Sequence, residues 1–419
     1  MKRYWKLIIL TAAVVLILGL FYTKTGTAND IGPSFTIKKI QGNEEEISNI
    51  LLDANYYQSR PAGSGHSLQI SAEGTKYFNE QSIAEQLFGF GWDKQIERWQ
   101  KEYRGYMRGK WPSLSSFFEN GKFLAYADVN YNFIESIGSS RDFTFDIDIL
   151  HKETEDRVKR ETEVPNRNQY YSMSVENVQV IDDVLKVFTS NQVEHQGNHE
   201  IEIHVYTFDI QTGELLDDKI IVEEKESLDA NQWAEIMILN KHEHIGEEEY
   251  VLAKVLNLEH VQDAENSGDY VEQVQQLYFV SYNVETGEIK QFEIPEIKPF
   301  LTAGISPIPD KALISGSTVY FAIFTTDEID VYSYSLETNS LQGSQKVPLE
   351  KSFSDSPVIK VAHERIYIVE WINKRDTDKS IIVADVESGE IVYSGRIELQ
   401  EPEEHSGEYE LYIHDIIFN

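Results

Sequence analysis

The chain of 419 residues contains no cysteine, which excludes disulfide bonds, a thiol nucleophile and a cysteine-based zinc site. Several catalytic patterns are absent as well. The sequence has no G-x-S-x-G nucleophile elbow, no H-E-x-x-H zinc helix, no phosphate-binding P-loop and no EF-hand loop. From motifs we therefore predict no catalytic residue, no cofactor and no metal ligand.

Positive charge is also scarce. Lys and Arg number 37 against 71 Asp and Glu, which gives a net charge of −34. The first 28 residues carry four of the positive charges and no acid, so the remainder of the chain carries −38. Phosphate backbones repel so acidic a body, and we expect no nucleic-acid partner. The simplest role of this charge is solubility.

The longest apolar run lies at the N-terminus. Residues 1–6 are basic, and residues 7–22 are almost wholly apolar. Sixteen helical residues are shorter than a hydrocarbon core of about 30 Å, so the flanking lysines would have to reach its surfaces. We predict a signal anchor at 1–28 that contacts the cell membrane as a single-pass helix. The alternative is a signal peptide cleaved after Ala28, which would release a secreted protein. The basic end stays in the cytoplasm, which places the body outside.

A turn phrase recurs along the C-terminal two thirds of the chain. Each copy follows a β-rich run and places Gly or Asn where a hairpin needs a positive φ. A repeat of roughly 40–60 residues is the period of four-stranded propeller blades. The four copies are Asp209–Glu214 (DIQTGE), Asn283–Glu288 (NVETGE), Ser335–Ser340 (SLETNS) and Asp385–Glu390 (DVESGE).

Five units of strands can be aligned on this phrase, at residues 122–164, 174–222, 234–294, 311–347 and 358–397. The first has Glu153-Thr154-Glu155 in the turn position. We predict that the acidic segment Glu259–Asp269 is a solvated loop in the third unit. Further strands at 35–79 and at Glu410–Asn419 have no partner of their own, and pairing between them would close a ring.

Residues 120–419 resemble the β-propeller repeat proteins of the bacterial cell envelope. The resemblance implies an all-β ring of about six four-stranded blades, alternatively seven, closed by N- and C-terminal strands. A pair of β-sandwiches is the structural alternative, but it does not explain the repeat. The expected organisation is a signal anchor at 1–28, closing strands at 29–79, a helical insertion at 80–120 and the repeats at 121–419.

The insertion carries the strongest local signal. Apolar residues recur at helical spacing over Asp93–Met107, which predicts an amphipathic helix. Six basic residues against three acidic ones lie between positions 93 and 111. Either the aromatic face packs on the body while the cations face water, or the segment contacts an anionic partner. The candidate contact residues are Arg98, Trp99, Lys101, Tyr103, Arg104, Arg108, Lys110 and Trp111.

Two histidine pairs, His195 with His199 and His242 with His244, lie beside acidic residues. Imidazole and carboxylate can bind Zn or Cu, but these residues fit mobile hairpin tips, and we predict solvated loops.

Two functions remain open. The first is a membrane-anchored, extracytoplasmic binding or regulatory module without enzyme activity, which recognises an envelope protein or an anionic envelope polymer. The second is an extracytoplasmic hydrolase or lyase with its site in the propeller channel. A propeller fold by itself favours neither.

The N-terminal charges make the topology testable. A reporter enzyme that is active only outside the cytoplasm, fused after Asn419, is expected to be active, because Lys2, Arg3 and Lys6 hold the N-terminus inside. A reporter active only in the cytoplasm, fused at the same position, should be silent. The reverse pattern would refute export.

Overall fold

The computed structural model describes residues 33–58, 66–77, 94–134, 139–195, 198–224, 231–240, 245–262, 270–297, 312–324, 328–349, 357–369, 379–400 and 409–418. The predicted anchor at 1–28, the pair His242 and His244, and the side chains of His195 and His199 lie outside this description. Among the described residues, no helix is long and apolar enough to cross a membrane.

The described strands form six antiparallel sheets, and within each the strand order largely follows the chain. The first sheet has β5 (Phe117–Glu119), β6 (Phe123–Ile134), β7 (Ser139–His151) and β8 (Arg157–Glu163). The second has β9 (Tyr170–Ile181), β10 (Val184–His195), β11 (Asn198–Asp209) and β12 (Leu215–Glu223). The third has β13 (Gln232–Ile238), β14 (Tyr250–Gln262), β15 (Tyr270–Asn283) and β16 (Ile289–Phe292).

The fourth sheet has β17 (Leu313–Ser315), β18 (Thr318–Phe324), β19 (Glu328–Ser335) and β20 (Ser340–Pro348). The fifth has β21 (Val358–Ala362), β22 (Arg365–Val369), β23 (Lys379–Asp385) and β24 (Ile391–Leu399), with β1 (Phe35–Gly42) added outside β24. The terminal sheet has β25 (Tyr409–Phe418), β2 (Ile50–Gln58), β3 (His66–Ser71) and β4 (Gly74–Tyr77).

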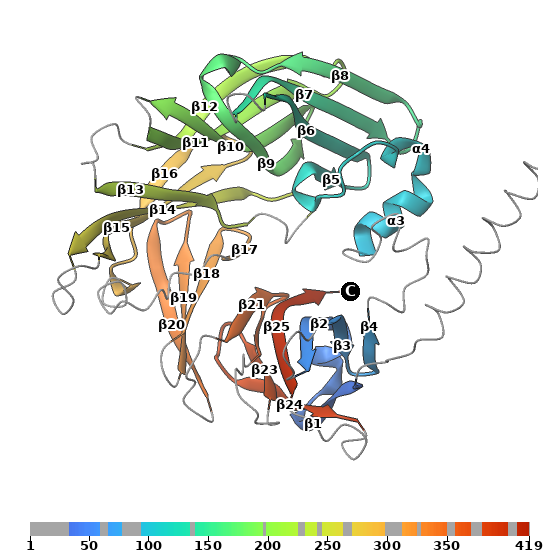
Figure 1. The fold of residues 1–419 in the computed structure, drawn as a ribbon, viewed down its shortest axis with the longest axis vertical. Coiled ribbons are helices and arrows are strands. Elements are labelled where there is room, and N and C mark those ends of the chain that lie inside the picture. The colour runs from blue at the N-terminus through green and yellow to red at the C-terminus, as the bar shows by residue number, and fades with distance from the viewer. Residues whose placement is uncertain are drawn as a thin grey trace, which may run out of the picture.

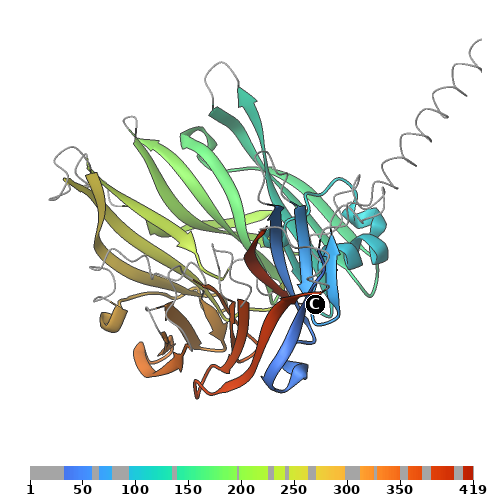
Figure 2. The same ribbon diagram turned by 60° about the horizontal axis from the view of Figure 1, so that its bottom comes forward.

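The sheets stand around a common middle, with β5, β17, β21 and β25 near it (Figure 1). Figure 2 shows the hairpins β6–β7, β10–β11 and β14–β15 extending to the same side of the molecule. The protein therefore has an all-β fold of mostly four-stranded antiparallel sheets, consistent with a propeller of about six blades.

The recurring phrase forms the turn between the third and fourth strands of a sheet. In the first copy, Asp209 Oδ1 accepts hydrogen bonds from the backbone N (2.8 Å) and the hydroxyl (3.0 Å) of Thr212. The N–H of Gly213 donates to the Asp209 carbonyl at 2.8 Å. The predicted positive φ is confirmed at 67°, 70°, 53° and 71° for Gly213, Gly287, Asn339 and Gly389. In the first sheet Glu155 takes this conformation without glycine, at 59°.

Strands from the two ends of the chain pair with each other. β2 runs antiparallel to β25, from Ile50 opposite Phe418 to Gln58 opposite Tyr409. β1 pairs with β24 in the neighbouring sheet. The leftover strands at the two ends of the chain therefore pair with each other, as the sequence predicted.

Apolar side chains fill the spaces between successive sheets. Five core clusters each join one sheet to the next, from the first sheet through the fifth to the terminal sheet. Each cluster contains side chains from both of the sheets that it joins. In chain order, examples are Phe145 with Tyr206, Val205 with Val255, Phe279 with Phe321, Val331 with Ile366, and Ile37 with Leu52. A sixth cluster packs the helices on the first sheet. Most sheets are thus covered by a neighbour on both faces, which explains their continuous apolar runs.

The predicted helix over Asp93–Met107 is present as two pieces, α3 (Lys94–Glu102) and α4 (Arg104–Met107). Tyr103 separates them with φ −118° and ψ 44°. Short 3₁₀ turns complete the fold: η1 (Glu44–Ile47), η3 (Leu114–Ser116), η4 (Arg167–Gln169) and η5 (Pro295–Ile297).

Two sequence boundaries were wrong. β5 lies inside the predicted helical insertion at 80–120 and supplies the first strand of the first sheet. The predicted acidic loop begins as strand, because β14 continues to Gln262 and pairs with β15 as far as Tyr270. A ring contact between Trp233 and His260, with centroids 4.3 Å apart, lies in this extension. Local polarity alone does not reveal such cross-strand contacts.

The junction of β1 with β24 requires glycine at position 42. Gly42 has φ +91°, and a Cβ there would lie 2.1 Å from the Val392 carbonyl oxygen. We expect Gly42→Ala to lower the free energy of unfolding by about 1–3 kcal/mol more than Gly109→Ala, because overpacking adds to the cost of positive φ. Gly109 is the matched control, with φ +82° and open space around it. Equal losses in urea denaturation would refute the steric argument.

Candidate interface on the helical segment

The apolar side of α3 and α4 packs on the first sheet. Trp99 is fully buried, and its ring centroid lies 4.9 Å from that of Phe117 on β5. Ile96, Tyr106 and Met107 join the same cluster. The spacing of these residues is that of one helical face, which is why the sequence pattern located the segment correctly.

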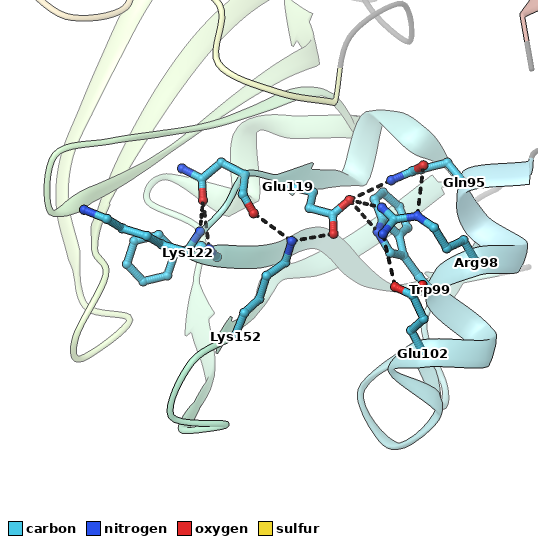
Figure 3. A network of polar contacts seen from close by, with 9 residues as sticks. Gln95, Arg98, Trp99, Glu102, Glu119, Lys122 and Lys152 are labelled. Atoms are coloured by element: carbon cyan, nitrogen blue, oxygen red, sulfur yellow. Dashed lines mark hydrogen bonds and ion pairs between the residues drawn. The ribbon is translucent and has the colours of Figure 1, made fainter.

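Glu119, at the end of β5, holds α3 in place (Figure 3). Its Oε2 accepts hydrogen bonds from Gln95 Nε2 (2.6 Å), from the indole of Trp99 (2.9 Å) and from the guanidinium of Arg98. Its Oε1 accepts from Lys152 Nζ at 2.5 Å. The carboxylate side chain is only 10% exposed, so it is surrounded by donors on both oxygens.

These donors keep Glu119 charged. Burial alone would raise the pKa of this carboxyl, but the hydrogen bonds from Lys152, Trp99 and Arg98 outweigh it, and the pKa is lowered. The backbone N of Glu119 also donates to the Ile245 carbonyl (2.9 Å), which ties β5 to the segment between β13 and β14. Glu119 therefore joins α3, the first sheet and the third.

Asp148 on β7 holds α4 and the residues after it. It forms ion pairs with Lys110 and with Arg157, whose Nε donates to Oδ1 at 2.7 Å. The Tyr106 hydroxyl donates to the Asp148 carbonyl at 2.7 Å, and Lys110 Nζ lies 3.8 Å from the centre of the Tyr106 ring. The side chains of Lys110 and Asp148 are 4% and 1% exposed.

Burial dominates the titration of Lys110. It lowers the pKa of Lys110, although the hydrogen bond to Asp148 acts in the opposite direction. The hydrogen bond to Asp148 raises the pKa of Arg157. The buried contact between Lys110 and Asp148 therefore has a structural role.

The eight predicted contact residues thus fall into two groups. Trp99 and Lys110 are buried, Arg98 is bound by Glu102 (3.1 Å) and Glu119, and Tyr103 is half-buried against the core. The rest remain exposed and form what we call the cationic surface: Lys101, Arg104, Arg108 and Trp111.

Two members of the cationic surface have no counter-ion among the residues that the structure describes. Arg104 and Arg108 are exposed and form no ion pair with the described part of the chain. The Lys101 side chain is 79% exposed and lies 3.6 Å from Glu97. Trp111 is 71% exposed, and its backbone N donates to the Tyr126 hydroxyl at 3.2 Å. This segment therefore carries exposed positive charge and an exposed indole within a few residues of one another.

The sequence did not identify the two acids that organise the segment. Glu119 and Asp148 lie on strands, and nothing in their local sequence separates them from other Asp and Glu residues. Among the described residues, no group of three or more His, Asp or Glu side chains is placed to bind a metal ion.

No sequence family model matches the chain, and no curated protein matches it. Among solved structures it is similar to polysaccharide lyase Uly1 (9% identity over 68% of this chain and 57% of that one, TM-score 0.36). It is also similar to the Dos1 propeller (10% identity over 68% of this chain and 62% of that one, TM-score 0.29). A third match is a subtype N10 neuraminidase-like protein of A/little yellow-shouldered bat/Guatemala/060/2010 (7% identity over 87% of this chain and 98% of that one, TM-score 0.31).

The chain spans little more than half the length of Uly1. All three TM-scores are below 0.5, so these likenesses carry no argument about activity or ligand.

The buried ion pair can be tested by removing its acid. Asp148→Asn is expected to lower the free energy of unfolding by about 3–5 kcal/mol, because Lys110 and part of Arg157 lose their buried counter-charge. The control Asp146→Asn should cost at most about 1 kcal/mol, since its partner Lys159 is 52% exposed. Chemical denaturation of both variants at neutral pH measures the difference, and similar costs would disprove this role of Asp148.

Proposed function

We propose that the protein is a membrane-anchored, extracytoplasmic binding or regulatory module, and that its cationic surface contacts the anionic headgroups of the membrane. The anchor would be the apolar run at residues 7–22, with the body outside the cytoplasm. The six sheets would form a closed six-bladed ring that the pairing of β2 with β25 completes. The remaining surface would then be free to recognise an envelope protein or polymer.

The observation that carries the proposal is the division of charge within one segment. Asp148 and Glu119 pair with Lys110 and Arg98, whereas Arg104 and Arg108 form no ion pair with any described residue, on a body of about −38. Free cations on so acidic a protein favour an external anion, and each contributes about 1 kcal/mol near an anionic membrane.

Trp111 favours a membrane over a soluble polymer. The residue is 71% exposed and directly follows Lys110, whose buried ion pair with Asp148 fixes the chain. Tryptophan is enriched at the headgroup level of membranes, where an apolar ring and a polar N–H are both accommodated. Arginine beside it can pair with phosphate oxygens in two hydrogen bonds.

We expect the triple variant Lys101→Gln, Arg104→Gln, Arg108→Gln to bind anionic vesicles about 100-fold more weakly than the wild type, from roughly 1 kcal/mol per cation. The measurement is co-sedimentation of residues 29–419 with phosphatidylglycerol vesicles at low salt. Raising the salt concentration should remove most of the wild-type binding, because screening acts within a Debye length.

Two controls separate the alternatives. Lys38→Gln, Lys39→Gln, Lys76→Gln removes the same charge from exposed lysines of β1 and β4 and should leave binding unchanged. Binding of the wild type to soluble polyphosphate, without binding to vesicles, would identify a polymer as the partner. A wild type that binds neither would exclude the cationic surface as an interface.

A further inference from the structure

The second sheet contains a histidine held between two carboxylates. His204 on β11 is 2% exposed. Its Nδ1 lies 2.7 Å from Asp218 Oδ1 on β12, and its Nε2 lies 2.8 Å from Glu202 Oε2 on β11. The two acid side chains are 21% and 18% exposed, so the contacts are largely shielded from water. Both ring nitrogens therefore face an anionic oxygen at hydrogen-bond distance.

This geometry requires a protonated ring. A neutral imidazole has one N–H and one lone pair, so it can donate to only one of the two carboxylates. Its lone pair would then face the other acid across less than 3 Å. Burial on its own would lower the pKa of His204, but the hydrogen bonds to Asp218 and Glu202 outweigh it, and the pKa is raised from 6.5.

The groups around the imidazole come from several strands. The Tyr206 ring on β11 stacks on it, with centroids 5.4 Å apart at 9°, and Tyr170 on β9 meets it edge-on at 5.9 Å. From β10, Thr189 lies opposite His204 in the ladder. Among the described residues, the titratable groups in contact with His204 are therefore two acids and two phenols. Neither phenol is ionised near neutral pH, since burial raises the pKa of both Tyr170 and Tyr206.

The histidine lies at an irregular point of the ladder between β11 and β12. The register between β11 and β12 shifts between Ile203 and His204, so the backbone pairing is irregular there. β12 is the outermost strand of its sheet, and it also contacts the third sheet, where Lys219 Nζ donates to the Gly287 carbonyl at 2.9 Å. The contact of His204 with Asp218 thus fastens an edge strand at an interrupted point of its ladder.

We propose that Glu202, His204 and Asp218 form a proton-dependent clamp that fastens β12 to β11, and that loss of the imidazole proton loosens this edge of the second sheet. Without the proton, one carboxylate faces a lone pair in a shielded site, and the arrangement is relieved when β12 moves away. The clamp is independent of the proposed contact with membranes.

The sign of the pH effect follows from the raised pKa. The stabilisation is fully present below the unfolded pKa of about 6.5 and is lost as the pH rises through the higher folded value. Protection of β12 amides against hydrogen exchange, corrected for the intrinsic rate, is therefore expected to fall at least about tenfold between pH 6.5 and 9. In His204→Gln the same amides should show no such fall, because the glutamine does not titrate.

The matched control is Val205→Ala, on the same strand with its side chain buried in the junction with the third sheet. It should lower overall stability and keep the wild-type pH dependence of β12. The proposal is overturned if the wild type and His204→Gln show the same pH dependence of protection.

A direct readout covers the case in which His204→Gln does not fold. In the full-length wild type, the His204 ring signals observed by NMR should titrate with a midpoint above 6.5. In Asp218→Asn the midpoint should shift to lower pH, because one of the two anionic partners is lost. A wild-type midpoint at or below 6.5, or the same midpoint in Asp218→Asn, would refute the clamp.

Discussion

The fold depends on one requirement: a β-sheet that is apolar on both faces must be covered on both faces. Val251 and Leu252 on β14 are both buried although successive strand residues point to opposite sides. One sheet therefore cannot be stable without its neighbours, and a linear stack would leave apolar faces open at its ends. Pairing β25 with β2 places the two ends of the chain in one sheet, and this sheet covers the face of the fifth sheet that does not pack on the fourth.

The sequence predicted those parts of the structure that are determined by neighbouring residues. The phrase at Asp209–Glu214 fixes its own turn through Asx and Ser/Thr hydrogen bonds, so its position and positive φ are local properties. The position of β1 beside β24 is not local, because it depends on a glycine meeting the Val392 carbonyl some 350 residues away. The three residues of β5 were missed for a different reason: the strand is very short and is recognised only through its pairing with β6, which begins at Phe123.

The candidate interface was predicted as a segment but not residue by residue. Arg108 and Lys110 are both cations after the same short helix, yet one is exposed and the other lies against Asp148. The difference comes from the position of β7, which helical spacing does not contain. Charge counting over the segment therefore overstated the free cations, because Glu119 and Asp148 of the first sheet each pair with one of them.

Burial has different consequences for the ionisable groups of this protein. Lys110 forms an ion pair with Asp148, and Arg98 forms one with Glu119, and these two pairs hold α4 and α3 on the first sheet. His204 is also held between charged partners, but the ordinary pKa of an imidazole lies near 6.5. Paired charges therefore support α3 and α4 structurally, whereas at β12 they surround a group that can titrate. The difference comes from the chemistry of the side chain and not from the geometry around it.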